Sequence, residues 1–258
     1  MNIPKDGFQT LSQKTQIVLI VILLFTVVPL SSQTPHNAKE IMRSVNDLYN
    51  NISQIQFSVT LNKRSVSESR VNNLLNISFK ISVRFPNRYR EEIDENQYLK
   101  DLGINGSIVE IFDGENTWTY FSNRNQYGVK SGAPYDDLKE HVFEVLCVPV
   151  QGTGIKLKDD EAALLREESI KANENQINCY VIEIPEDKEP DYDPQWWTLW
   201  VDTRSHIVWR VERRSITPKG SNESTITFQS VKINEPIPDG DFTFTPPTGA
   251  QKITFPAF

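Results

Sequence analysis

Histidine and cysteine, two residue types often used for metal binding and catalysis, are few in this chain of 258 residues and lie far apart along it. The three histidines, His36, His141 and His206, show no ligand-type spacing to one another or to the two cysteines, so neither a zinc site nor a Ser-His-Asp triad is predicted. Gly152 and Gly154 form a fragment of a glycine-rich loop, but no Lys-Ser or Lys-Thr pair follows them. The sequence therefore predicts no metal, no nucleotide and no other cofactor.

Carboxylates offer one alternative chemistry. The segment from Glu186 to Asp193 is acidic, and Asp191 and Asp193 could collect calcium or serve a hydrolase. The segment lacks the glycine and the distal glutamate of a calcium loop, and its prolines favour an exposed linker. Adjacent pairs such as Glu91 with Glu92 would point apart on a strand, so they do not form a glycosidase dyad. We expect a protein that is not an enzyme, with a hydrolase as the weaker alternative.

Cys147 and Cys179 are the only cysteines. In an oxidising compartment a disulfide between them would close a loop of about 32 residues and contribute about 3 to 4 kcal/mol. Both cysteines stand among apolar neighbours, so two separate buried thiols are the alternative.

The first 33 residues read as an export signal. Lys5 and Lys14 precede an almost unbroken apolar run from Ile17 to Leu30, and small polar residues follow it. The run of about 14 residues is shorter than the ~20 that cross a bilayer comfortably, which favours a cleaved signal. Since no Ala-x-Ala site precedes Thr34, an uncleaved anchor to the inner membrane formed by residues 17–30 is the alternative. Either way the domain at 34–258 is expected in the periplasm.

Charge excludes one class of partner. The whole chain has a net charge of −7, and no basic cluster is evident along it. An acidic domain of this kind is a poor ligand for polyanions, so nucleic acid is not an expected partner. We expect a monomer.

Apolar periodicity predicts the elements that would position any site. From Leu75 to Phe85 every odd position is apolar and every even position is polar, as in a long strand with one buried face. At about 3.3 Å per residue this strand spans about 36 Å and requires a large antiparallel sheet. From Asn37 to Ile52 apolar residues recur at three- and four-residue steps, which predicts an amphipathic helix with Asn37 and Glu40 at its N-cap.

The rest of the chain is typical of short strands with few helices. The pair Asp113-Gly114 predicts a hairpin turn within 107–121, and 136–146 is predicted to be a second helix. Segments 62–73 and 128–134 are interpreted as polar connections. Further strands are expected at 54–61, 88–93, 163–170, 177–184, 196–215, 225–233 and 242–245. Since strands and helices do not alternate in the βαβ manner, we predict one antiparallel α+β domain that is mainly β.

Tryptophans lie on both faces of the predicted hairpin 196–215. Trp197, Leu199 and Trp209 are expected on the buried face. Trp196 and Trp200, with Val208 opposite, are expected on the other face, which predicts that something apolar covers both sides. A helix or terminal segment of this chain would do so, and a protein or lipid partner is the alternative.

Four stretches, taken in order, resemble the LolA/LolB-type periplasmic lipoprotein carriers. They are the N-terminal helix followed by IQFSVTL, the strand ISVRFPNRYR, the hairpin IVEIFDGENTWTYF, and the series from LWVDTRSHIVWRVERRS to DGDFTFTPPTGA. The resemblance implies an incomplete antiparallel β-barrel, a strongly curved sheet with helices covering its concave open side, around a cavity for acyl chains. The Arg-Pro pair of the best-known carriers is Phe85-Pro86 here, so control of the lid by an arginine is not implied.

We therefore expect an exported, non-enzymatic carrier or binding protein in lipoprotein sorting or envelope maintenance, with lipid or lipoprotein acyl chains as its ligand. The alternative is a membrane-tethered sensor or interaction module that binds an envelope protein. The residues expected to line an apolar cavity are Phe57, Val59, Phe79, Ile81, Val83, Trp118, Tyr120, Trp197, Leu199 and Trp209.

Overall fold

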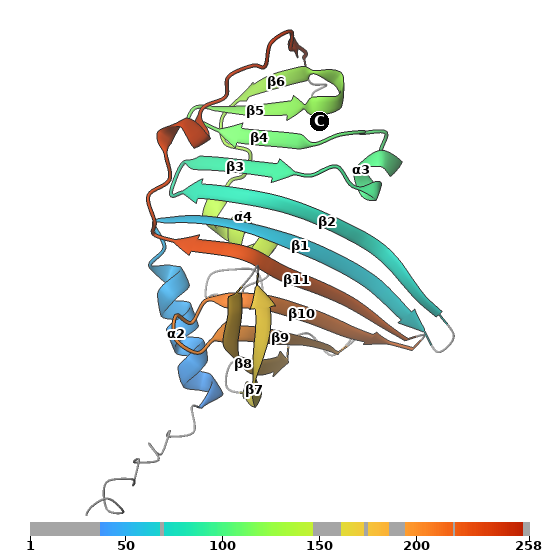
Figure 1. Ribbon diagram of the computed structural model, residues 1–258, viewed down its shortest axis with the longest axis vertical. Helices are drawn as coiled ribbons and strands as arrows, with labels where there is room; N and C mark the ends of the chain where they lie inside the picture. Colours follow the sequence, from blue (N-terminus) through green and yellow to red (C-terminus); the bar gives the residue numbers. More distant parts are fainter. Residues whose placement is uncertain are drawn as a thin grey trace, which may run out of the picture. The chain divides into compact units, whose positions relative to one another are not determined.

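The computed structural model describes residues 37–67, 70–146, 161–172, 175–185, 194–218 and 220–254. These residues form one twelve-stranded sheet in the order β12-β6-β5-β4-β3-β2-β1-β11-β10-β9-β8-β7 (Figure 1). All neighbouring strands are antiparallel except the short pair β12 and β6. The sheet is strongly curved and does not close, so the predicted fold class is confirmed.

The sheet consists of long central strands flanked by shorter ones. The strands are β1 (Gln54–Ser67), β2 (Arg70–Arg84), β3 (Arg88–Ile93), β4 (Ile108–Phe112), β5 (Asn116–Phe121), β6 (Gln126–Ser131), β7 (Ala163–Ala172), β8 (Asn175–Pro185), β9 (Gln195–Asp202), β10 (Val208–Thr217), β11 (Gly220–Ile233) and β12 (Gln251–Lys252). The helices are α2 (Ala38–Asn50), α3 (Gln97–Asp101) and α4 (Leu138–Leu146), with short 3₁₀ turns η1 (Ser122–Arg124) and η3 (Asp239–Phe242).

Both predicted long helices are present and cover one face of the sheet, which we call the inner face. Asn37 caps α2 by accepting a hydrogen bond from the Lys39 amide, and Asp137 accepts one from the Glu140 amide at the start of α4. The buried side chains of α2 and α4 belong to the same apolar cluster as the inner faces of β1, β2, β8, β9, β10 and β11. Among the described residues, none of the helices has the length and apolar character needed to cross a membrane.

The opposite side of the sheet, the outer face, is covered in part by the chain after β11. Phe242 and Ile237 in this C-terminal segment are buried, and Arg84 bonds both the Ile237 carbonyl and the Asp239 carboxylate. The predicted strand at 242–245 is wrong, because this part of the segment lies as η3 and irregular chain across the sheet instead of joining it. The predicted loop at 128–134 is also wrong at its start, where β6 pairs with β5.

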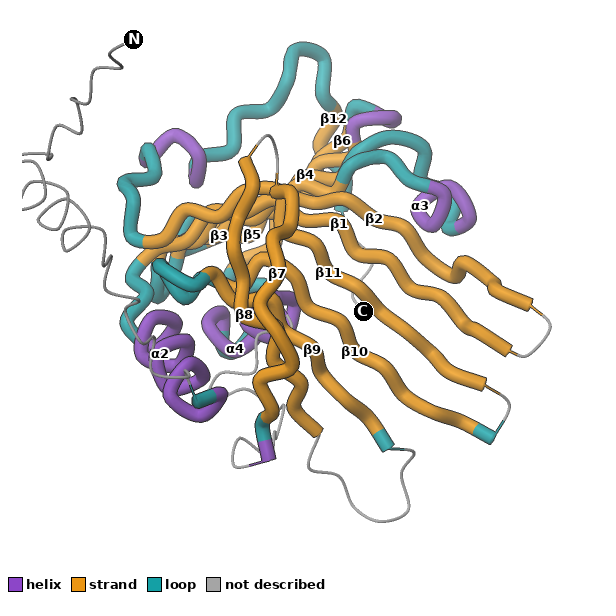
Figure 2. Tube along the Cα trace, turned by 60° about the horizontal axis from the view of Figure 1, so that its bottom comes forward, coloured by secondary structure: helices purple, strands orange, loops and turns teal. Residues whose placement is uncertain are grey.

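The main difference from the prediction lies in the polar segment 62–73. Instead of a connection, it contains the paired ends of β1 and β2, whose register runs from Gln54 opposite Arg84 to Ser67 opposite Arg70. β10 and β11 lengthen in the same way, to Thr217 opposite Gly220. We call residues 62–67, 70–76, 212–217 and 220–225 the distal ribbon. Its four strand ends run past the covering helices (Figure 2).

Candidate functional site

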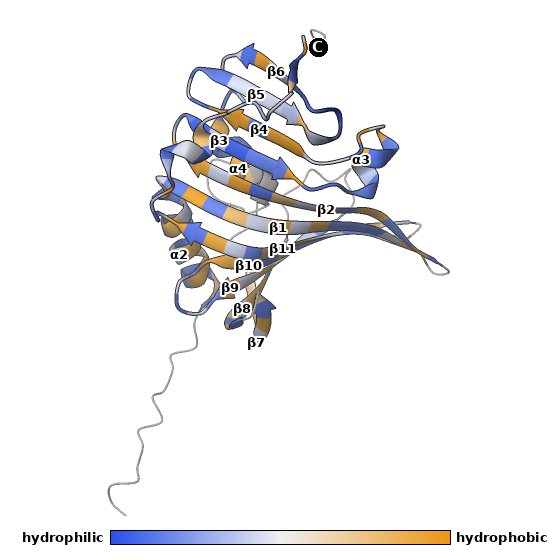
Figure 3. Ribbon diagram, turned by 45° about the horizontal axis from the view of Figure 1, so that its top comes forward, coloured by the Kyte–Doolittle hydropathy of each residue, from blue (hydrophilic) through white to orange (hydrophobic). Residues whose placement is uncertain are grey.

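Five of the predicted cavity residues lie together at the centre of the inner face. The register sets Phe57 opposite Ile81 and Val59 opposite Phe79, with Val83 one pair further along, and the alternation is visible in Figure 3. All five are at most 7% exposed. They pack in one cluster with the apolar faces of α2 and α4, so they form the core of the folded chain.

The predicted residues of β9 and β10 join the same core. Trp197 and Leu199 are fully buried on the inner face. Trp209 lies at an irregularity between β10 and β9 and packs, half-buried, against both this core and a second, smaller cluster. The same irregularity turns Val208 inward, so its predicted place on the outer face is wrong.

Trp118 and Tyr120 lie on the outer face, so the prediction that they share a surface with Phe57 is wrong. Ile81 pairs with Glu91, Glu91 pairs with Glu110, and Glu110 pairs with Thr119, so Thr119 lies on the same inner face as Ile81. Its neighbours Trp118 and Tyr120 therefore lie on the outer face. Both rings pack against Phe244 of the C-terminal segment, with centroid distances of 5.4 Å for Trp118 and 6.2 Å for Tyr120.

On the outer face of β9, side chains of the neighbouring strands bury Trp200, whereas the prediction was a covering helix or terminal segment. Trp200 is buried with Cys179 and Val181 of β8, and its indole donates a hydrogen bond to Glu168 of β7. The Arg210 guanidinium lies 4.6 Å from its ring centre. Trp200 is therefore a structural residue of the sheet.

Four pockets among the described residues show what kind of surface is available for binding. Those of about 560, 500 and 220 Å³ are lined mainly by polar and charged side chains, and one of about 340 Å³ is lined equally by polar and apolar ones. Phe57 is the only predicted cavity residue that contacts any of these four pockets. The central inner face is filled by the protein's own side chains.

A group of ionisable side chains interrupts the inner face where β3 meets β4. Glu91 and Glu110 are direct cross-strand neighbours. Tyr89 lies beside Glu91, and Tyr135 and His141 stack with their ring centres 3.3 Å apart against Tyr89. Sequence reasoning missed this group, although Glu91 and Glu110 occupy positions of apolar parity between Tyr89 and Ile93 and between Ile108 and Phe112.

Burial sets the protonation of this group. Desolvation raises the pKa of Glu91 to about 7, the neighbouring Tyr89 hydroxyl opposes the shift, and the nearby Glu110 carboxylate adds to it. Burial likewise raises the pKa of Glu110 and of the Tyr89 and Tyr135 hydroxyls. The group therefore holds a proton close to neutral pH. No cluster of three or more His, Cys, Asp or Glu side chains among the described residues is arranged to hold a metal ion.

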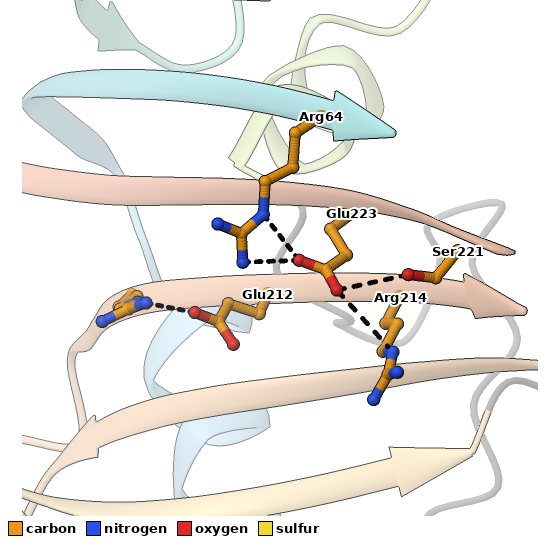
Figure 4. Close-up of polar contacts among 6 residues, drawn as sticks. Arg64, Glu212, Arg214, Ser221 and Glu223 are labelled. Carbon is orange, nitrogen blue, oxygen red and sulfur yellow. Dashed lines mark hydrogen bonds and ion pairs between the residues drawn. The ribbon is translucent and has the colours of Figure 1, made fainter. Parts of the chain in front are cut away.

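Charged side chains concentrate on the distal ribbon (Figure 4). On its outer face Glu223 accepts hydrogen bonds from Arg64 at 2.7 Å and from Ser221 at 3.4 Å, and Arg214 approaches it to 3.8 Å. Arg210 pairs with Glu212 beside them. No basic cluster is evident along the sequence because these cations come from strands far apart along the chain.

Three predictions concern residues outside the described parts. The export signal or anchor at 1–33 and the acidic segment with Asp191 and Asp193 lie there entirely. The Cys179 side chain is buried, and burial raises the pKa of its thiol to about 12. Since Cys147 also lies outside the described residues, the disulfide stays a prediction.

The model of the family described as "Predicted periplasmic protein (DUF2092)" matches residues 38–256. The chain belongs to this family. Membership of DUF2092 supports the periplasmic location that the N-terminal segment predicts. No curated protein matches the chain.

Solved structures similar to this DUF2092 protein share little sequence with it. An uncharacterised conserved protein from Thermus thermophilus is 11% identical with a TM-score of 0.43, over 85% of this chain and all of its own. A LolA superfamily protein from Nitrosomonas europaea is 13% identical with a TM-score of 0.31, over 81% of this chain and 98% of its own. MucB, solved with MucA from Pseudomonas aeruginosa, is 10% identical with a TM-score of 0.40, over 81% of this chain and 62% of its own.

Proposed function

We propose that this protein is a non-enzymatic periplasmic binding module that holds an acidic segment of an envelope protein against its distal ribbon. The observation that carries the proposal is that four strands continue beyond the core with both faces open. Lys63, Asn72 and Asn222 on the inner side and Arg64 and Arg214 on the outer side are all exposed. Strands this long are not needed to bury a core, so their surface is available for binding.

The charge of the distal ribbon fits an acidic partner. Its residues include five cations against two glutamates, whereas the chain as a whole carries −7. A positive local field attracts an acidic segment, and the acidic remainder of the protein repels the same segment, so the segment is directed to the distal ribbon. Apolar contacts are available as well, because Val71 is 58%, Leu74 is 61% and Ile216 is 43% exposed.

Site-specific photocrosslinking in the periplasm tests this proposal. A photoreactive residue in place of Leu74 should give a discrete adduct that mass spectrometry maps to an acidic segment, and the double variant Lys63→Glu, Arg70→Glu, at two exposed sites, should reduce its yield. The same residue in place of Lys39, exposed on α2, is the control and should give none. Equal adducts at both sites, or an adduct that charge reversal leaves unchanged, would refute the proposal.

The carrier of lipid or lipoprotein acyl chains is the second candidate. It is favoured by the apolar centre of the inner face and by α4, a helix of nine residues that packs there through Leu138, Val142 and Phe143. If α4 moved away, an acyl chain could replace these contacts, with a gain of about 0.8 kcal/mol for each buried CH₂. Displacement of a fluorescent fatty acid tests this candidate, and a saturable stoichiometric signal would support it.

A further inference from the structure

The largest pocket among those described above lies on the outer face, away from both the core and the distal ribbon. It has a volume of about 560 Å³ and is formed by β1, β2, β3 and β11 together with η3. This size is within the range of small-molecule sites. The side chains that face it are almost all polar, and they include Gln56, Ser58, Lys80, Ser82, Ser230 and Lys232.

Strand register assembles these side chains into two rows. Lys80, Ser58 and Ser230 lie side by side across β2, β1 and β11, and in the next row Ser82, Gln56 and Lys232 do the same. Alternation along each strand puts both rows on one face, with the core residues between them on the other.

The floor of the pocket is made of ordered hydrogen-bonding groups. Gln56 donates to the Ser82 hydroxyl at 2.9 Å, and the hydroxyls of Ser58 and Ser230 are 2.9 Å apart. In the serine pair one hydroxyl donates to the other, so the accepting hydroxyl keeps its own proton for a ligand. Ser82 is only 7% exposed, although it faces away from the core.

Three cations line the pocket, and two of them, Lys80 and Lys232, are available to a ligand. Arg90 is already engaged, because it pairs with Glu92 at 2.5 Å and donates to the Asp241 carbonyl. Lys80 and Lys232 have no ion pair with any residue that the structure describes. Their backbones are two strands and two residues apart, about 9.6 Å across and about 6.8 Å along the sheet. The flexible stems of two lysines bridge that separation, so both ammonium groups can reach one anion.

We propose that this outer-face pocket binds a small polyol, a sugar or glycerol, that carries one phosphate group. The two lysines supply point charges for the phosphate, and the serine hydroxyls and the Gln56 amide match the ligand's hydroxyl groups. The proposal does not depend on the function proposed above, because the two involve different surfaces.

Calorimetric titration of the full chain with glucose 1-phosphate tests the proposal. We expect saturable binding that weakens as salt is added, weaker binding of inorganic phosphate, and no measurable binding of glucose. Lys80→Gln and Lys232→Gln should each weaken binding at least about fivefold. Lys39→Gln, which makes the same charge change on α2, should not alter it. All three lysines are exposed, so circular dichroism should show unchanged folding.

Vesicles of phosphatidylglycerol distinguish a lipid headgroup from a soluble ligand. Binding of the sugar phosphate in solution, with the stated lysine dependence, supports the proposal. Binding to the vesicles alone would overturn it, as would equal loss of affinity in Lys39→Gln or no binding of any of these probes at millimolar concentration.

Discussion

Replacing Glu91 by glutamine is expected to remove most of the dependence of stability on pH between pH 5 and pH 8. Glu91 faces the inner side of the sheet beside Glu110 and Tyr89, and its burial raises its pKa from 4.5 to about 7. The folded state therefore holds a proton that the unfolded chain releases. This proton stabilises the folded state most below pH 4.5, and its contribution falls as the pH rises towards 7, where the folded protein also loses the proton.

The size of the effect follows from the shift. At about 1.4 kcal/mol per pKa unit, burying the ionised Glu91 carboxylate lowers the free energy of unfolding by about 3 kcal/mol in total. About 2.5 kcal/mol of this loss occurs between pH 5 and pH 8. Glutamine is neutral at every pH and has nearly the same size and shape as glutamate. Glu91→Gln should therefore be more stable than the parent protein at pH 8 by about 2 to 3 kcal/mol, and the difference should shrink towards pH 5.

Urea denaturation at pH 5, 6, 7 and 8 measures this difference directly. Glu235→Gln is the matched control, because Glu235 is exposed and the substitution makes the same change of charge. The control should track the parent protein at each pH. A parent protein whose stability is flat from pH 5 to pH 8, or a Glu91→Gln variant that tracks the control, would refute the reasoning about burial at this site.

Three further variants test the packing. Gly220→Ala should destabilise the protein by more than about 1 kcal/mol in urea denaturation, because Gly220 has φ +142° and an added Cβ would lie 2.0 Å from a β1 carbonyl oxygen. Gly240→Ala is the control: an added Cβ has open space there, so the substitution should not change stability. Ile81→Ala should cost about 2 to 5 kcal/mol and Val71→Ala, at an exposed site, less than about 0.5. Tyr49→Phe should raise the unfolding rate and lower the free energy of unfolding by about 1 to 3 kcal/mol. The substitution removes the hydroxyl that accepts a buried hydrogen bond from the Val208 amide of β10.

The sequence predicted the elements that bury one face. Strict alternation along β2 identified Phe79, Ile81 and Val83 as inward-facing, and three- and four-residue periodicity located α2 and α4, because burial imposes those periods on any chain. The distal ribbon escaped prediction for the same reason. Its strands are held by backbone hydrogen bonds and are open on both faces, so no apolar alternation is required of them.

The candidate site was harder to predict than the fold. Trp118 and Tyr120 alternate correctly within β5, but which face is inner depends on strand register and on the C-terminal segment that covers their rings. At Val208 a single irregularity in the pairing of β10 with β9 moves the side chain from the expected outer face to the inner face. The outer-face pocket combines β1, β2, β3 and β11, so only the pairing of distant strands brings its two lysines together.

The apolar inner face is a packed core, and both surfaces that we propose for binding lie outside it. Native mass spectrometry of the gently purified protein distinguishes this arrangement from an acyl carrier. We expect the mass of the polypeptide without lipid, and no stoichiometric uptake when a fluorescent fatty acid is added. A lipid retained in one-to-one ratio, released by substitutions at Ile81 or Val83 but not at Trp118, would contradict the packed core and restore the acyl carrier as the leading function.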